Sequence, residues 1–198
     1  MQERTADRAL AVLAVAWVAA VAALQAGSVL DPADVASSLE AVADGALWRL
    51  LASALVVDAP AAAAQIAIVA ALTALVLVRD GGVTWWLAAL AGHVGSALLA
   101  YAGIAVADAL GSASAERFIA EPDYGVSCVL AALNGVVLAG TVRRIRARRA
   151  GAIDWIVVAG TASATVVWLA TLDWYGVEHL YAFGIGALVA ILRARRSG

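Results

Sequence analysis

Six long apolar segments dominate this 198-residue sequence and constrain its fold more than any other feature. Each has roughly the 17 to 25 residues that a helix needs to cross a hydrocarbon core about 30 Å thick. Hydrophobic residues make up 64% of the chain and charged residues only 14%, far from the composition of soluble domains. We therefore expect an all-α bundle of six transmembrane helices in one domain, residues 1–198. The expected spans are residues 9–26, 59–78, 83–107, 124–142, 155–172 and 174–192.

The arginines predict how this bundle is oriented. All 13 basic residues are arginine, and with six spans eleven of them fall on the same side as the N-terminus. Because cytoplasmic loops are enriched in arginine and lysine, both termini are expected in the cytoplasm of a multi-pass protein of the cell membrane. The cluster at residues 143–149 could also bind nucleic acid or anionic lipid. A topology anchor is the simpler interpretation, and we expect no nucleic-acid partner.

The segment between the first two spans, residues 27–58, is too long for a simple connection. Its second half, ALWRLLASALVV, is apolar but too short to cross a bilayer, so it predicts an interfacial or re-entrant element. Trp48 and Arg49 are expected to anchor it among the lipid headgroups. Asp58 and Pro60 favour the start of the second span just beyond it.

Polar residues inside the spans are candidates for function, because polar groups are costly in lipid. Ser127 lies about 5 Å below the outer end of its span and His179 about 7 Å below the outer end of the last span. His93 is about 15 Å from the inner end of the third span, near the membrane midplane, and is the poorer partner for Ser127.

Small residues at helical spacing accompany both Ser127 and His179. Ser127 is followed by Ala131, Gly135 and Ala139, and His179 by Ala182, Gly186 and Ala190. Such stripes allow two membrane helices to approach closely, which would bring the hydroxyl to the imidazole. A serine beside a histidine can perform nucleophilic catalysis, with the ring accepting the hydroxyl proton. Gly125, Cys128 and the free N–H groups at the start of the span could help to bind an oxyanion.

Three motifs carry a resemblance to a known family. Gly125-Val126-Ser127-Cys128, followed by Ala132-Leu133-Asn134-Gly135, resembles the G-x-S-G motif of rhomboid intramembrane serine proteases. Glu178-His179, with Ala182 and Gly186, resembles the sixth helix of that family. Trp48-Arg49 is similar to the tryptophan-arginine motif of its first outer loop.

The resemblance implies a six-helix rhomboid-like fold in a divergent prokaryotic branch, and a protease that cleaves single-pass membrane proteins near the outer membrane face. Ser127 would be the nucleophile and His179 the general base, with no cofactor and no metal. The chain departs from the family pattern at Cys128, where a glycine usually stands, and at Ala131, often a tyrosine that packs on the histidine. The second-helix H-x-x-x-N pattern is replaced by PAAAAQIA, where Gln65 is the amide that could support the oxyanion.

Other interpretations of these residues stay open. A catalytically inactive rhomboid-like protein would bind transmembrane helices without cutting them, and Ser127 would then be a packing residue bonded to its own helix. A small transporter could use His93, Asn134 and Glu178 as a polar path, although no internal repeat favours it. Taken one at a time, His93 is expected to be a buried structural histidine. Asn134 is expected to be either a contact between helices or a functional amide. Glu178 is expected either to raise the basicity of His179 through its charge or to face the outer water.

Overall fold

The computed structural model describes residues 2–27, 30–57, 61–171 and 173–197, and regular secondary structure within these residues is entirely helical. Six of its helices are long and apolar enough to cross a membrane, which confirms the predicted number of spans. These are α1 (Gln2–Gly27), α5 (Ala62–Arg79), α6 (Gly81–Ala109), α8 (Val126–Arg146), α9 (Ala152–Thr171) and α10 (Trp174–Ser197).

Most of these helices extend beyond the apolar runs from which they were predicted. α6 begins at Gly81 and ends at Ala109, and α8 and α10 continue through arginines to Arg146 and Ser197. Long arginine side chains tolerate such positions because their stems lie along apolar surface while the charge reaches water. The predicted start of the second span at Asp58 and Pro60 lies outside the described residues.

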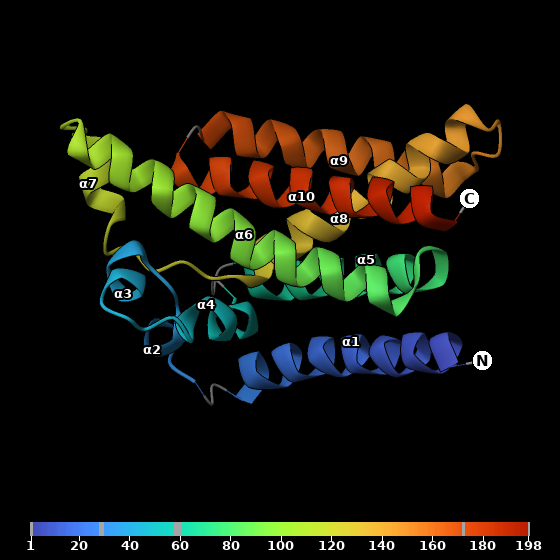
Figure 1. The fold of residues 1–198 in the computed structure, drawn as a ribbon, viewed down its shortest axis with the longest axis horizontal. Coiled ribbons are helices and arrows are strands. Elements are labelled where there is room, and N and C mark those ends of the chain that lie inside the picture. The colour runs from blue at the N-terminus through green and yellow to red at the C-terminus, as the bar shows by residue number, and fades with distance from the viewer. Residues whose placement is uncertain (1, 28–29, 58–60, 172, 198) are drawn as a thin grey trace.

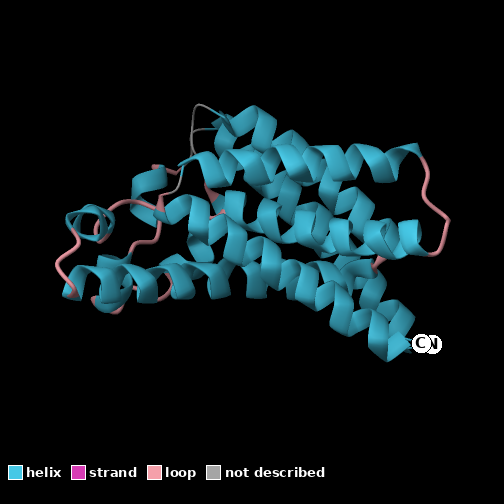
Figure 2. Ribbon diagram, turned by 90° about the horizontal axis from the view of Figure 1, so that it is seen from above, coloured by secondary structure: helices cyan, strands magenta, loops and turns pink. Residues whose placement is uncertain are grey.

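Helix α8 is the centre of the bundle. Residues along most of its length are buried, from Val126 to Thr141, and it packs against α5, α6, α9 and α10. Helices α1 and α9 lie at opposite edges and bury the smallest share of their surface (Figure 1). The N- and C-termini lie at one end of the bundle, here named the termini end (Figure 2). The opposite end, named the loop end, carries the short helices.

Close packing between α8 and α10 depends on glycine. A Cβ atom at Gly186 would collide with the backbone carbonyl of Ala132, and one at Gly135 would collide with the carbonyl of Phe183. Gly92 of α6 also lies against Ala132, and a Cβ atom there would collide with the Ala132 side chain. The predicted small-residue stripes therefore face each other, and they fix the relative positions of the helices that carry Ser127 and His179.

The loop end is built from α2 (Pro32–Val35), α3 (Leu39–Ala43), α4 (Arg49–Ala52), a 3-10 turn η1 (Ser53–Leu55) and α7 (Ala113–Phe118). Trp48 is exposed, and the Arg49 guanidinium lies 5.5 Å from its ring centroid. Arg49 also donates to the carbonyl of Ala36 at 3.2 Å, which ties α4 to the end of α2. The segment 46–57 is thus a short helical element with an exposed tryptophan.

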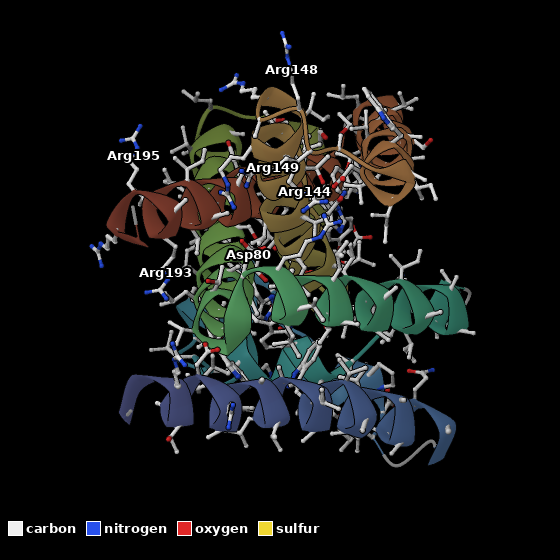
Figure 3. All side chains as sticks on the ribbon, turned by 90° about the vertical axis from the view of Figure 1, so that its right-hand side faces the viewer. Asp80, Arg144, Arg148, Arg149, Arg193 and Arg195 are labelled. Carbon is white, nitrogen blue, oxygen red and sulfur yellow. The ribbon has the colours of Figure 1, made fainter. Side chains whose placement is uncertain are left out.

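A buried carboxylate joins three helices at the termini end, onto which Figure 3 looks. The side chain of Asp154, at the start of α9, is fully buried and lies 3.1 Å from both Arg79 of α5 and Arg144 of α8. Thr141 donates a further hydrogen bond to it at 3.3 Å. Asp154 therefore holds α5, α8 and α9 together by charge-assisted hydrogen bonds.

Replacing Asp154 should destabilise the bundle. In Asp154→Asn the two arginines lose their shared counter-charge, and Arg79 stays mostly buried without it, so the change costs more than loss of a surface ion pair does. We expect the thermal unfolding midpoint in detergent to fall by about 5 to 10 °C. Asp34→Asn, at an exposed aspartate of the loop end, is the matched control and should leave the midpoint unchanged. Equal midpoints for the two variants would contradict the role given to Asp154.

Candidate functional site

Ser127 and His179 line the same cavity at the loop end of the bundle. The cavity has a volume of about 380 Å³, and Gln65 of α5 and Tyr175 of α10 also line it. Ser127 stands in the first turn of α8, and His179 is one turn and a half into α10. The backbone thus brings together three residues that were selected from the sequence, contributed by three different helices.

The hydroxyl of Ser127 is bonded within its own helix. Its Oγ donates to the carbonyl of Tyr124 at 3.1 Å, and no hydrogen bond joins it to His179 among the described residues. Ser127 is only partly buried, so its hydroxyl borders the cavity. A rotation about χ1 would release it from Tyr124, since a serine side chain has three staggered positions.

The ring of His179 is held by an aromatic residue that the sequence analysis missed. Trp168 of α9 stacks on it with ring centroids 5.5 Å apart and an angle of 6° between the planes. The Nδ1 atom of His179 is buried and has no hydrogen-bond partner among the described residues. Among the described residues, no carboxylate bonds to Nδ1 to orient this ring, and Trp168 supplies the contact expected from a tyrosine at the position of Ala131.

The N–H groups assigned to the oxyanion site at Gly125 and Cys128 are already engaged. Gly125 donates to the carbonyl of Ser53 at 2.9 Å, and Cys128 donates to the carbonyl of Gly125 at 3.1 Å. The Cys128 side chain is fully buried, and its Sγ donates to Glu178 at 3.2 Å. Gln65, the third residue assigned to the oxyanion site, differs from Gly125 and Cys128 because it lines the cavity.

A buried polar network lies next to the cavity and was not predicted. The Ser37 hydroxyl is 2.8 Å from the hydroxyl of Tyr101, which donates to Asp123 at 3.2 Å. Ser37 also donates to Ser53 at 3.4 Å, and the Ser53 hydroxyl lies 3.2 Å from Nε2 of His93. The network joins the loop end to α6 and to the residues that precede α8, so it fixes where α8 begins.

The depth estimated for His93 was wrong. Its ring lies directly against Gly125, where a Cβ atom would collide with it, so it sits at the start of α8 rather than far below Ser127. The estimate failed because α6 is 29 residues long, so counting from one end of its apolar run does not locate the membrane midplane. His93 is buried and bonded to Ser53, in agreement with the predicted structural role.

Glu178 and Asn134 are both buried. Glu178 is 2% exposed and accepts hydrogen bonds from Cys128 and from Ser96, the latter at 3.5 Å. The suggestion that it faces the outer water was therefore wrong.

Asn134 accepts a hydrogen bond from Thr161 of α9 at 2.8 Å. This bond makes Asn134 a contact between α8 and α9.

Asp123, Cys128 and Glu178 are the residues that come closest to a metal-ligand set in the described part of the chain. One potential ligand atom from each lies within 4.8 Å of the others, and all three are buried. Their atoms are paired within the protein, however, since Cys128 donates to Glu178 and Tyr101 donates to Asp123. We therefore treat the group as part of the polar network.

Burial of Asp123 makes the stability of the network depend on pH. Desolvation raises the pKa of this carboxyl from its ordinary value of 3.8 to about 6. The folded protein then holds the proton more tightly than the unfolded chain, so Asp123 contributes less to stability as pH rises from about 4 to about 6. We expect Asp123→Asn, which cannot ionise, to gain in thermal unfolding midpoint relative to the wild type over this range. A difference between the two proteins that stays constant with pH would contradict this expectation.

Comparisons of the chain with protein-family models, curated proteins and solved structures give no match.

Proposed function

We propose that this chain is a rhomboid-type intramembrane serine protease, with a rhomboid-like fold and both termini in the cytoplasm of a prokaryotic cell. Its substrates would be single-pass membrane proteins, cut near the outer membrane face. One observation carries the proposal: Ser127 and His179, on closely packed helices, border one cavity. In this orientation the loop end faces outward, and most arginines lie at the cytoplasmic end.

The proposed mechanism uses Ser127 as nucleophile and His179 as general base. The Ser127 hydroxyl leaves the Tyr124 carbonyl, gives its proton to His179 and attacks the carbonyl carbon of a substrate peptide bond. We assign Nε2 as the accepting atom, because Nδ1 of His179 is buried. The imidazolium then protonates the leaving amine, and water hydrolyses the acyl-enzyme with His179 again as base.

The position of His179 against Trp168 suits this role without a third catalytic residue. Stacking on an indole restricts rotation of the imidazole, and the electron-rich ring face favours the cationic form that proton transfer creates. A base oriented by packing can still act on a serine within reach, because geometry is the first requirement of proton transfer.

Gln65 and the N–H of Ser127 are the proposed oxyanion donors. Ser127 is the second residue of α8, so its N–H precedes the first intrahelical hydrogen bonds and lies at the positive end of the helix. Gln65 adds a side-chain amide from α5 across the cavity. Together these donors would stabilise the negative charge of the tetrahedral intermediate.

Gln65→Ala should slow acylation of Ser127 by about 10²-fold, since loss of one oxyanion donor has effects of this order. The measurement is the second-order rate constant for labelling by a serine-directed phosphonate. Gln25→Ala, a glutamine of α1 outside the cavity, is the matched control and should label at the wild-type rate. A wild-type rate in Gln65→Ala would remove Gln65 from the oxyanion site.

The proposal is tested by exposing the purified wild-type chain, in lipid nanodiscs, to an alkyl fluorophosphonate or isocoumarin probe. We expect covalent modification, with mass spectrometry of the digested protein placing the adduct on Ser127. Folded protein that remains unmodified would reject the enzyme and favour the alternative, a catalytically inactive rhomboid-like protein. That alternative has its own support in the bond from Ser127 to Tyr124 and in the burial of Cys128.

A further inference from the structure

A second cavity lies at the termini end, far from Ser127, and is lined by basic side chains. It has a volume of about 630 Å³ and is bordered by the start of α1, by Val83 of α6 and by the end of α10. Its four arginines are Arg4, Arg8, Arg193 and Arg196, and its one acid is Asp7. Figure 3 shows Arg193 pointing from α10 toward α1, whereas Arg195 and Arg148 point away from the bundle.

Three arginines of this cavity differ from Arg79, Arg143 and Arg144 on the other side of the termini end. There Arg79 and Arg144 are bound to Asp154, and Arg143 is bound to Asp80 at 3.2 Å, so acids of the chain compensate their charge. Within the described residues, Arg4, Arg8 and Arg196 form no ion pair, and all three are exposed. The cavity therefore has positive charge that no described side chain neutralises by an ion pair with these three arginines.

The one acid of the cavity, Asp7, is hydrogen-bonded to the N-terminus of α6. Its Oδ1 accepts a hydrogen bond from the N–H of Val83 at 3.0 Å, and its backbone carbonyl lies where a Cβ at Gly82 would have to stand. Asp7 thus caps the first turn of α6, and its charge is balanced by the positive end of that helix dipole. Because this one carboxylate is shared with a helix N-terminus, Arg4, Arg8 and Arg196 remain able to bind an anion.

Exposed apolar side chains lie further along the two helices that carry the cavity arginines. On α10 these are Leu188, Ile191 and Leu192, and on α1 they are Val12 and Leu13, all of them exposed. Each lies within about three turns of a cavity arginine on the same helix, by 3.6 residues per turn. A ligand with an anionic head and long apolar chains satisfies both surfaces, whereas a free anion satisfies only the arginines.

We propose that this cavity binds the phosphate headgroup of an anionic phospholipid, with Arg4, Arg8 and Arg196 as phosphate ligands and the acyl chains along α1 and α10. Guanidinium groups bind phosphate through paired N–H donors, which suits a phosphodiester. Because α1 lies at the edge of the bundle, the lipid would hold α1 against α6 and α10. The proposal does not depend on the proposed proteolytic function.

The test uses full-length protein purified in a neutral detergent and stripped of lipid. Phosphatidylglycerol, phosphatidylcholine and inorganic phosphate are added separately, and binding is followed by native mass spectrometry and by the thermal unfolding midpoint. We expect phosphatidylglycerol to bind and to raise the midpoint, and the other two to do neither at the same concentration. Equal effects of phosphatidylcholine would overturn the charge recognition, and equal effects of inorganic phosphate would overturn the lipid as ligand.

A pair of charge-matched variants assigns the binding to this cavity. Arg4→Gln/Arg8→Gln/Arg196→Gln removes the three proposed ligands, and Arg146→Gln/Arg148→Gln/Arg195→Gln removes three exposed arginines of the same end outside the cavity. We expect at least a tenfold loss of affinity for phosphatidylglycerol only in the first variant. Equal affinities of the two variants would overturn the proposal. If the first triple variant does not fold, the affinities of the single variants Arg196→Gln and Arg195→Gln for phosphatidylglycerol are compared instead, and only Arg196→Gln should lose affinity.

Discussion

Ser127→Ala and His179→Ala are each expected to abolish covalent labelling by a serine-directed phosphonate and cleavage of a single-pass membrane substrate. Loss of the nucleophile removes the atom that attacks, and loss of the base leaves an unactivated hydroxyl, so either change should lower the rate by about 10³-fold or more. The two losses should not add in the double variant, because the residues act as one unit. Labelling is measured by in-gel fluorescence and cleavage by the appearance of the shortened substrate.

The controls for this prediction come from two other serines. Ser53 forms a 3.2 Å contact with His93 and is thus a competing serine-histidine pair, but both residues are buried and neither lines the cavity. Ser163 is exposed on α9 and bonds to the carbonyl of Ala159. We expect Ser53→Ala and Ser163→Ala to keep their labelling. Labelling that survives in Ser127→Ala and disappears in Ser53→Ala would move the active site to the buried pair.

The six spans could be predicted because they follow from local properties of the chain. Length and apolarity of a segment determine whether it can cross a membrane, whatever its neighbours are. The facing stripes on α8 and α10 were predictable for a related reason, since glycine and alanine at helical spacing have few other uses in lipid. These two properties account for the presence of Ser127 and His179 at one cavity.

The partners of the site residues could not be predicted in the same way. Trp168 reaches His179 from α9, and nothing in the spacing of one tryptophan in an apolar run indicates which neighbour it will stack on. The network joins Ser37 to Tyr101, 64 positions away, and Tyr101 to Asp123, 22 positions away. Hydroxyls in loops and helices have many local partners, so their spacing does not predict these bonds. A signal was available at Asp123 alone, because it is an acid that stands just before an apolar span.

Helix length explains the error at His93. Depth was counted from the ends of apolar runs, which treats every helix as a rod of about 30 Å perpendicular to the membrane. A helix of 29 residues is about 43 Å long, so α6 must tilt or protrude, and a residue near its middle can contact the start of α8. Ser127 and His179 both lie within two turns of a helix start, where such counting spans a shorter distance, and they line one cavity.

Gly186→Val is expected to push α8 away from α10, to destabilise the protein and to abolish activity. The first atom of the new side chain would collide with the backbone carbonyl of Ala132, which cannot move without displacing α8. Overpacking of this kind typically destabilises a protein by about 1–3 kcal/mol, and a clash with backbone leaves no rotamer that relieves it. We expect a lower thermal unfolding midpoint and no labelling of Ser127.

Gly184→Val is the control that makes this result specific to helix contact. It introduces the same β-branched residue into the same helix two positions earlier, where a Cβ atom meets nothing within 4 Å. Any loss of activity caused by valine itself, by its effect on helix propensity or by removal of a flexible glycine, should appear in both variants. Gly184→Val should therefore retain labelling and unfold near the wild-type midpoint. If the two variants behave alike, the approach of α10 to α8 at Ala132 is not what holds His179 at the cavity.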